Sequence, residues 1–191
     1  MTWSTVNRCL FAAALFHPPT SWLDDELDVM AAECGSGPEC ATARQQVAGL
    51  AGSLEERETE YARLFLLNPE GVPAQPYGSY WLERQQTLNG ETTREVHARM
   101  SDHGLSPSGG LLADYIAAEL EFLAWLLEQG GLEDARWLMD HHLKAWTPDF
   151  LEALRSANPH PFYRGAAEFL ESTLAVVCSE MTRDRQQVGG H

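Results

Sequence analysis

Helical periodicity is clearest in LLADYIAAELEFLAWLLE, which is residues 111–128. An α-helix repeats about every 3.6 residues, so side chains three or four positions apart lie on one face. Apolar residues follow this spacing: Leu112, Ile116, Leu120, Leu123 and Leu127. Asp114, Glu121 and Glu128 recur every seventh residue on another face. The stretch therefore predicts a helix that packs one side into a core and presents an acidic side.

The rest of the chain favours helices as well. It is rich in Ala, Leu, Glu, Gln and Arg, and no segment alternates apolar and polar residues as a strand does. Capping residues or first-turn prolines predict further helix starts. Among them are Ser53-Leu54-Glu55-Glu56, Thr92-Thr93-Arg94-Glu95, Thr147-Pro148 and His160-Pro161. We expect an all-α bundle of roughly eight to ten helices.

The length of 191 residues corresponds to one domain. An apolar helical face ends at Met181, and the sequence then becomes polar and Gly-rich. We therefore expect a single helical domain over residues 1–182 and a flexible tail over residues 183–191. Two segments with low helix propensity, Asn68–Pro76 and Gly104–Gly110, are the best candidates for hinges.

The net charge is strongly negative. Thirteen Lys and Arg stand against 28 Asp and Glu, which gives −15. Such a surface repels nucleic acids and anionic lipids, whereas it attracts basic peptides from a distance. The apolar run Cys9–Phe16 is too short to span a bilayer, which takes about 20 residues. We expect a cytoplasmic protein without stable membrane insertion.

Familiar enzyme signatures are absent from the sequence. It contains no phosphate-binding P-loop, dinucleotide-binding glycine motif, nucleophile elbow or HExxH zinc motif. His142 falls on an apolar helical face, which favours a hydrogen-bonded core or groove histidine over a metal ligand. We expect neither enzymatic activity nor a cofactor or metal. The alternative is an all-helical enzyme or binder of a small ligand or metal that uses Asp114, Glu121 and His142.

The most unusual local feature is the aromatic run Pro73–Leu82, which is preceded by Glu60–Phe65. Core packing alone seldom needs Pro, Gly and three aromatic residues so close together. One interpretation is that Tyr80 and Trp81 anchor a loop on the core. The other is that residues 76–79 start a helix beside a groove for an apolar peptide with an attached cation.

Several blocks of the chain, taken in order, resemble the TorD/DmsD/NarJ family of redox-enzyme maturation chaperones. The blocks are LFHPP (15–19), EYARLF (60–65), PYGSYWL (76–82), ETT (91–93), GL (104–105), DYIAAELEFL (114–123) and HLKAW (142–146) followed by Phe150. Each block alone is weak evidence for the family, but the ordered set is strong evidence. Ala113 and Tyr115 depart from the family pattern, which has Pro and His there. Tyr115 keeps a hydrogen-bonding ring but cannot carry a positive charge.

The resemblance implies a helical chaperone that binds the twin-arginine signal peptide of a molybdenum-cofactor oxidoreductase and assists cofactor insertion and assembly before export. Its partners are then this leader and the apo form of the catalytic subunit. Alternatively, the chain recognises the folded subunit rather than its leader. We expect Asp114, with Glu121 or Glu119, to pair with the arginines of the leader. The full set of expected peptide-binding residues is Tyr61, Phe65, Pro76, Tyr77, Ser79, Trp81, Asp114, Tyr115, Glu119, Glu121, Phe122, His142 and Trp146.

Overall fold

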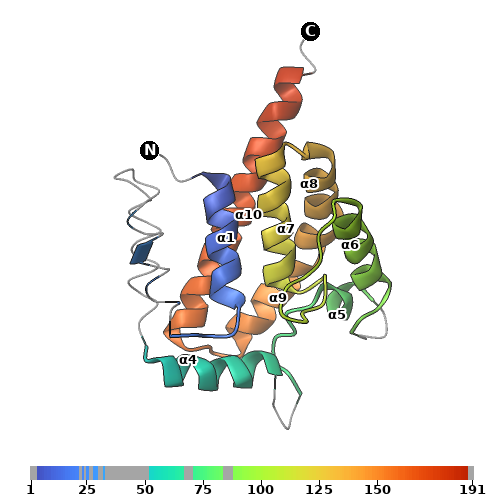
Figure 1. The fold of residues 1–191 in the computed structure, drawn as a ribbon. Coiled ribbons are helices and arrows are strands. Elements are labelled where there is room, and N and C mark those ends of the chain that lie inside the picture. Colours follow the sequence, from blue (N-terminus) through green and yellow to red (C-terminus); the bar gives the residue numbers. More distant parts are fainter. Residues whose placement is uncertain are drawn as a thin grey trace.

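The computed structural model describes residues 4–21, 23, 25, 28, 29, 32, 52–66, 71–83 and 88–188 (Figure 1). Regular secondary structure in these ranges is helical, which confirms the predicted all-α class. The helices are α1 Thr5–Phe16, α4 Leu54–Tyr61, α5 Gly78–Leu82, α6 Glu91–Asp102, α7 Ile116–Gln129, α8 Leu132–Leu138, α9 Lys144–Ser156 and α10 Pro161–Val188. Two π-helical turns, η1 Ala62–Leu66 and η2 Met139–Leu143, continue α4 and join α8 to α9.

Helix α7 forms the centre of the bundle. Apolar side chains on most faces of this helix are buried, and Ile116, Leu120 and Leu123 are 0% exposed. Helix α1 packs along α7 and also contacts α10, and the three run side by side in Figure 1. Phe11 of α1 meets Phe169 of α10 edge to face, with 4.8 Å between ring centroids. These contacts give the described residues one continuous hydrophobic core.

Two of the predicted helix starts are confirmed. Ser53 caps α4: its hydroxyl accepts a hydrogen bond from the Glu56 N–H, and the Glu56 carboxylate accepts one from the Ser53 N–H. This reciprocal pair satisfies two of the N–H groups that a helix start leaves without partners. Pro161 is the first residue of α10, where its missing N–H removes no helical hydrogen bond.

A helix begins near Thr92, as predicted, but Thr92 does not cap it. Helix α6 begins at Glu91, after Gly90, so both threonines lie in its first turn. The cap comes from outside the helix, because the Glu83 carboxylate accepts a hydrogen bond of 2.9 Å from the Thr92 N–H. A local capping pattern cannot reveal such a partner.

The predicted start at Thr147-Pro148 is wrong, because Pro148 lies inside α9. The chain is helical from Leu132 onward, and the π-helical turn η2 directly precedes α9. The Thr147 hydroxyl donates to the Leu143 carbonyl oxygen over 2.7 Å, which supplies a hydrogen bond close to the proline. The proline is therefore accommodated within a continuous helical segment.

The ends of the predicted segments differ in detail from the structure. Helix α10 continues to Val188, so its backbone remains helical beyond residue 183, where we expected the tail to begin. The expected hinge at Gly104–Gly110 forms the irregular connection between α6 and α7. The other, Asn68–Pro76, lies partly outside the described residues.

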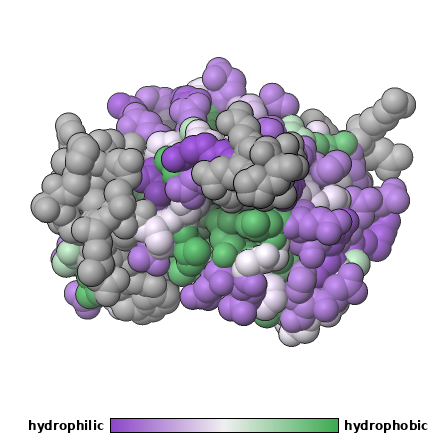
Figure 2. All heavy atoms as spheres, turned by 90° about the horizontal axis from the view of Figure 1, so that it is seen from above, coloured by the Kyte–Doolittle hydropathy of each residue, from purple (hydrophilic) through white to green (hydrophobic). Residues whose placement is uncertain are grey.

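One face of the molecule carries an apolar patch. Figure 2 shows one face of the molecule, on which hydrophobic residues gather in a patch bordered by hydrophilic ones. Within the described ranges, no helix combines the length and apolar character needed to cross a bilayer.

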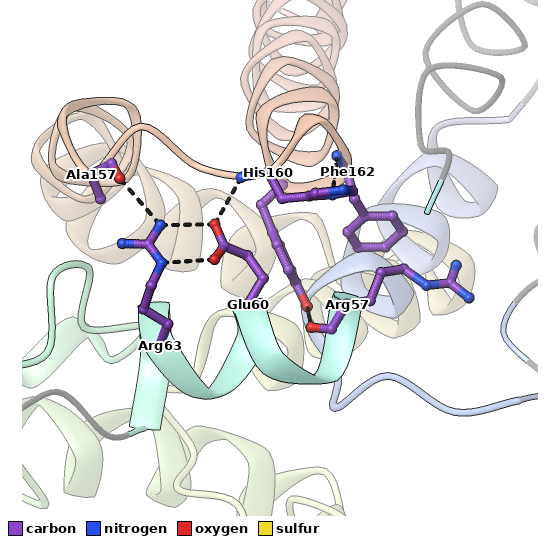
Figure 3. Close-up of polar contacts among 7 residues, drawn as sticks. Arg57, Glu60, Arg63, Ala157, His160 and Phe162 are labelled. Atoms are coloured by element: carbon purple, nitrogen blue, oxygen red, sulfur yellow. Dashed lines mark hydrogen bonds and ion pairs between the residues drawn. The ribbon is translucent and has the colours of Figure 1, made fainter. Parts of the chain in front are cut away.

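An ion pair fixes the end of α4 to the connection between α9 and α10 (Figure 3). Glu60 accepts two hydrogen bonds from the Arg63 guanidinium, over 2.7 and 2.8 Å, and a third of 2.7 Å from the His160 N–H. Arg63 also donates to the Ala157 carbonyl oxygen over 3.2 Å. The pair thereby positions the segment that carries Tyr61 and Phe65.

Stability is expected to fall in acid partly through Glu60. The hydrogen bonds from Arg63 hold the pKa of Glu60 below its usual value of about 4.5. Between the folded and unfolded pKa values the unfolded chain binds more protons, so this contribution is complete above about pH 4.5 and is lost as pH falls through the folded pKa. Glu60→Gln should flatten this part of the stability profile in urea unfolding at pH 3 to 7.

Glu58→Gln, an exposed change on the same helix, is the matched control and should keep the acid dependence of the original chain. Identical pH profiles for both variants would show that the Glu60–Arg63 pair makes no such contribution.

Candidate functional site

Helix α5 is held against the segment that precedes α7. The Gly78 N–H donates to the Asp114 carbonyl oxygen, and the Ile116 N–H donates to the Pro76 carbonyl oxygen, each over 2.9 Å. Tyr77 and Tyr115 thus form an isolated antiparallel bridge. The apolar stripe predicted a helix that already includes Leu112. Because Tyr115 is extended, α7 instead begins at Ile116. The sequence blocks 76–82 and 114–123 meet here.

Asp114 lies inside the protein. It is 0% exposed, and its Oδ2 accepts a hydrogen bond of 2.7 Å from the Ser79 N–H in the first turn of α5. Ser79 is also fully buried. Asp114 therefore fixes α5 instead of lining an open acidic groove, where we expected it to meet arginines.

Tyr115 joins three parts of the bundle. Its hydroxyl donates to the Phe16 carbonyl oxygen at the end of α1 and lies 2.9 Å from the hydroxyl of Tyr61 on α4. Tyr61 in turn packs edge to face on Phe65, with 5.2 Å between centroids. Tyr61, Phe65 and Tyr115 all belong to the expected site, and each is at most 5% exposed. Burial raises the pKa of Tyr61 and of Tyr115, which keeps both hydroxyls protonated as hydrogen-bond donors. They support the site from within the core.

A buried polar cluster connects α7 to α9. The Trp146 Nε1–H donates to Glu119 Oε2 over 3.1 Å, and His142 Nδ1 lies 3.4 Å from Glu119 Oε1. Burial raises the pKa of Glu119 despite the interaction with His142. Gly78 of α5 packs on the Trp146 ring, since a Cβ there would lie 3.1 Å from Nε1. Glu119, His142 and Trp146 thus hold the helices together and are closed to solvent.

Two aromatic residues of the expected site remain partly exposed, Tyr77 and Trp81. The Tyr77 ring packs on Tyr115, with 5.2 Å between centroids. The Trp81 Nε1–H donates to the Gln75 carbonyl oxygen over 2.7 Å, and its ring meets Tyr80 edge to face. Trp81 therefore anchors a loop, as one interpretation of the aromatic run predicted, while the groove of the other interpretation stays a prediction.

Glu121 and Phe122 line an open cavity of about 210 Å³. Its other walls are Met100, Leu105, Ser106, Pro107, Ala118 and Trp125. The Glu121 side chain is 40% exposed, and its Oε1 accepts a hydrogen bond of 2.7 Å from His17 Nε2. The cavity therefore places a solvent-accessible carboxylate beside an apolar surface. Of the thirteen expected residues, these two line this cavity.

Most of the apolar walls of the cavity were not among the expected site residues. Trp125 follows Glu121 by four positions and so lies on the same face of α7, a spacing that the sequence contains. Leu105 and Pro107 come from the connection between α6 and α7, which the sequence singled out only as a hinge. Their approach to Phe122 depends on tertiary packing.

The residues of the alternative enzyme site do not share this opening. Asp114 and His142 are at most 2% exposed, whereas Glu121 lies at the surface. Among the residues that the structure describes, no three His, Cys, Asp or Glu side chains are grouped so that they would hold a metal ion.

Comparison with known proteins gives the family. Residues 37–152 match the model of the nitrate reductase delta subunit family. The chain belongs to this family. The match confirms the resemblance to the TorD/DmsD/NarJ family that the ordered blocks indicated.

Two relatives of this chain are named as chaperones. The Tat proofreading chaperone DmsD of Salmonella typhi is 32% identical over 125 residues, and that of Salmonella typhimurium is 30% identical over the same length. Each match covers 64% of this chain and 61% of the relative, so the similarity spans about three-fifths of the relatives' length.

A solved structure shares the fold. It is described as a redox enzyme maturation protein from Archaeoglobus fulgidus, and the match covers 90% of this chain and 96% of that one. The TM-score is 0.64 at 21% sequence identity. This likeness supports the helical architecture as a whole.

Proposed function

We propose that this protein is a chaperone that binds the twin-arginine signal peptide of a molybdenum-cofactor oxidoreductase. It holds the apo catalytic subunit back from export while cofactor is inserted and the subunit is assembled. Family membership and the Salmonella relatives, which are named Tat proofreading chaperones, support this function. The observation that carries it is the Glu121 carboxylate at the rim of an apolar cavity.

The cavity suits the chemistry of such a leader. A twin-arginine leader presents two guanidinium groups next to an apolar stretch, so its receptor needs an acceptor for cations beside a hydrophobic surface. Glu121 offers the acceptor, and the Trp125 ring, one turn further along α7, offers a face on which a planar guanidinium stacks. Phe122 and Met100 offer apolar contacts to the residues that follow. The net charge of −15 favours the encounter.

The buried residues of the expected site act as its frame in this proposal. Asp114 fixes α5, Tyr115 fixes the end of α1, and the cluster around Glu119 fixes α9. Tyr77 and Trp81 extend the aromatic surface that the leader meets. The affinity expected is micromolar, about −8 kcal/mol, because a chaperone must release its client.

Titration calorimetry with a synthetic leader peptide tests the function. The peptide should bind with micromolar affinity, and a peptide with both arginines replaced by glutamine should bind at least tenfold more weakly. Equal binding of both peptides, or no binding of either, would contradict the proposal. A pull-down with the leaderless client tests whether the folded subunit is recognised instead.

His17 is hydrogen-bonded to the Glu121 carboxylate, which in this proposal accepts the leader's guanidinium. Its Nε2 donates to Oε1 of Glu121, so an incoming guanidinium competes with His17 for this oxygen. His17→Ala should therefore strengthen leader binding, by up to about fivefold, since exposed ion pairs contribute about 0 to 1 kcal/mol. Titration calorimetry measures this change.

His141→Gln, an exposed histidine on η2, serves as the control and should leave leader affinity unchanged. Weaker binding by the His17 variant would show that His17 supports the leader instead of competing with it.

A further inference from the structure

A second cavity, of about 480 Å³, lies between α6 and the connection that leads to α7. Its volume falls within the usual range for small-molecule sites, about 300 to 1,000 Å³. Ser106 and Pro107 line both this cavity and the one beside Glu121, so the two share a wall. None of the expected peptide-binding residues lines it.

One wall of this cavity is basic. Arg94 and His97 lie three positions apart on α6 and both line it. Among the described residues, Arg94 has no carboxylate within ion-pair distance, whereas Arg63, Arg99 and Arg155 each pair with one. In a chain with a net charge of −15, an arginine that faces a cavity in this way is available to an anion from solution.

Thr93 is a further residue of this wall. It lines the same cavity and is only 4% exposed, and its Oγ1 is buried with no hydrogen-bond partner among the described residues. Because this oxygen has almost no accessible surface, Thr93 supports the wall of the cavity and its hydroxyl does not reach a group inside it. The helix start contributes little here, because the Glu83 carboxylate already accepts from the Thr92 N–H.

The facing wall is apolar and includes Leu111, Leu112 and Pro107. A ligand that uses both walls needs an anionic group joined to an apolar body. We propose that this cavity binds a small organic anion, whose carboxylate or phosphate group meets Arg94 and His97 while its apolar part packs on Leu111 and Leu112. The inference is independent of the proposed leader-binding function.

Ligand-detected NMR and calorimetry with four probes test the chemistry: phenyl phosphate, benzoate, inorganic phosphate and phenol. Phenyl phosphate or benzoate should bind at least tenfold more tightly than inorganic phosphate and phenol, because each of the latter lacks one half of the ligand. The tighter of the two aromatic anions identifies the anionic group. Failure of both to bind at millimolar concentration would overturn the proposal.

Two charge-matched variants locate the binding. Arg94→Gln should lower the affinity for the tighter aromatic anion at least tenfold. Arg164→Gln removes the same charge from an exposed position on α10 and should leave that affinity unchanged. Equal affinities in the two variants would overturn the assignment to this cavity. A thermal melt of each variant checks that it is folded.

Discussion

Replacing Glu121 by glutamine should weaken leader binding at least tenfold, which corresponds to about 1.4 kcal/mol. The change keeps the size of the side chain and removes only its charge. Glu121 is the charged side chain that lines the apolar cavity, so a leader guanidinium seated there loses its charge-assisted partner. The loss should be greatest at low salt, because screening over about 10 Å at 0.1 M weakens partly exposed pairs. Titration calorimetry at two salt concentrations measures both effects.

Glu128→Gln is the matched control for Glu121→Gln. Glu128 lies on the same helix seven positions later, is exposed and carries the same charge. Its loss should change leader affinity less than twofold at 0.15 M salt, since a distant charge acts only through the overall field. If both variants bind as the original chain does, Glu121 takes no part in recognition.

Replacing Asp114 by alanine should destabilise the protein. The Ser79 N–H would then be buried without its acceptor, which costs about 1 to 3 kcal/mol. For a chain of this size, each kcal/mol lowers the melting temperature by about 2 to 4 °C. Calorimetric melting measures the shift. Helix α5 should lose order first, because the Asp114 side chain fixes its first turn.

Asp114→Asn separates the hydrogen bond from the charge. Asparagine keeps a carbonyl oxygen that accepts from the Ser79 N–H, so this variant should retain most of the stability that alanine loses. A melting temperature for Asp114→Ala equal to that of the original chain would show that the bond to Ser79 is not needed for the fold. Weaker leader binding by Asp114→Asn with an unchanged melting temperature would instead return Asp114 to the binding surface.

The fold class followed from local patterns. The apolar stripe of residues 116–127 is a property of the helix itself and faces the core in the structure, as at Leu120 and Leu123. The helix starts were harder to predict, because a cap is supplied by whatever acceptor lies nearest in space. At Ser53 that acceptor is local, but at Thr92 it is the carboxylate of Glu83, which belongs to another part of the chain.

The positions of the expected site residues were harder to predict for a related reason. Asp114 and Glu121 occur at a spacing that places two residues on one face only if both lie in the helix. Tyr115 is extended and α7 starts after it, so Asp114 turns inward while Glu121 faces solvent. The extended conformation results from the pairing with Pro76 and Tyr77, which lie far away in the sequence. Composition and periodicity contain no information about that pairing.

The wall formed by Ser106 and Pro107 has a thermodynamic consequence. A ligand on one side that moves this wall changes the shape available on the other side. By linkage, any factor by which an anion changes the affinity for the leader must equal the factor by which the leader changes the affinity for the anion. If anion binding moves this wall, it changes the leader affinity, and the leader then changes the anion affinity by the same factor in the same direction.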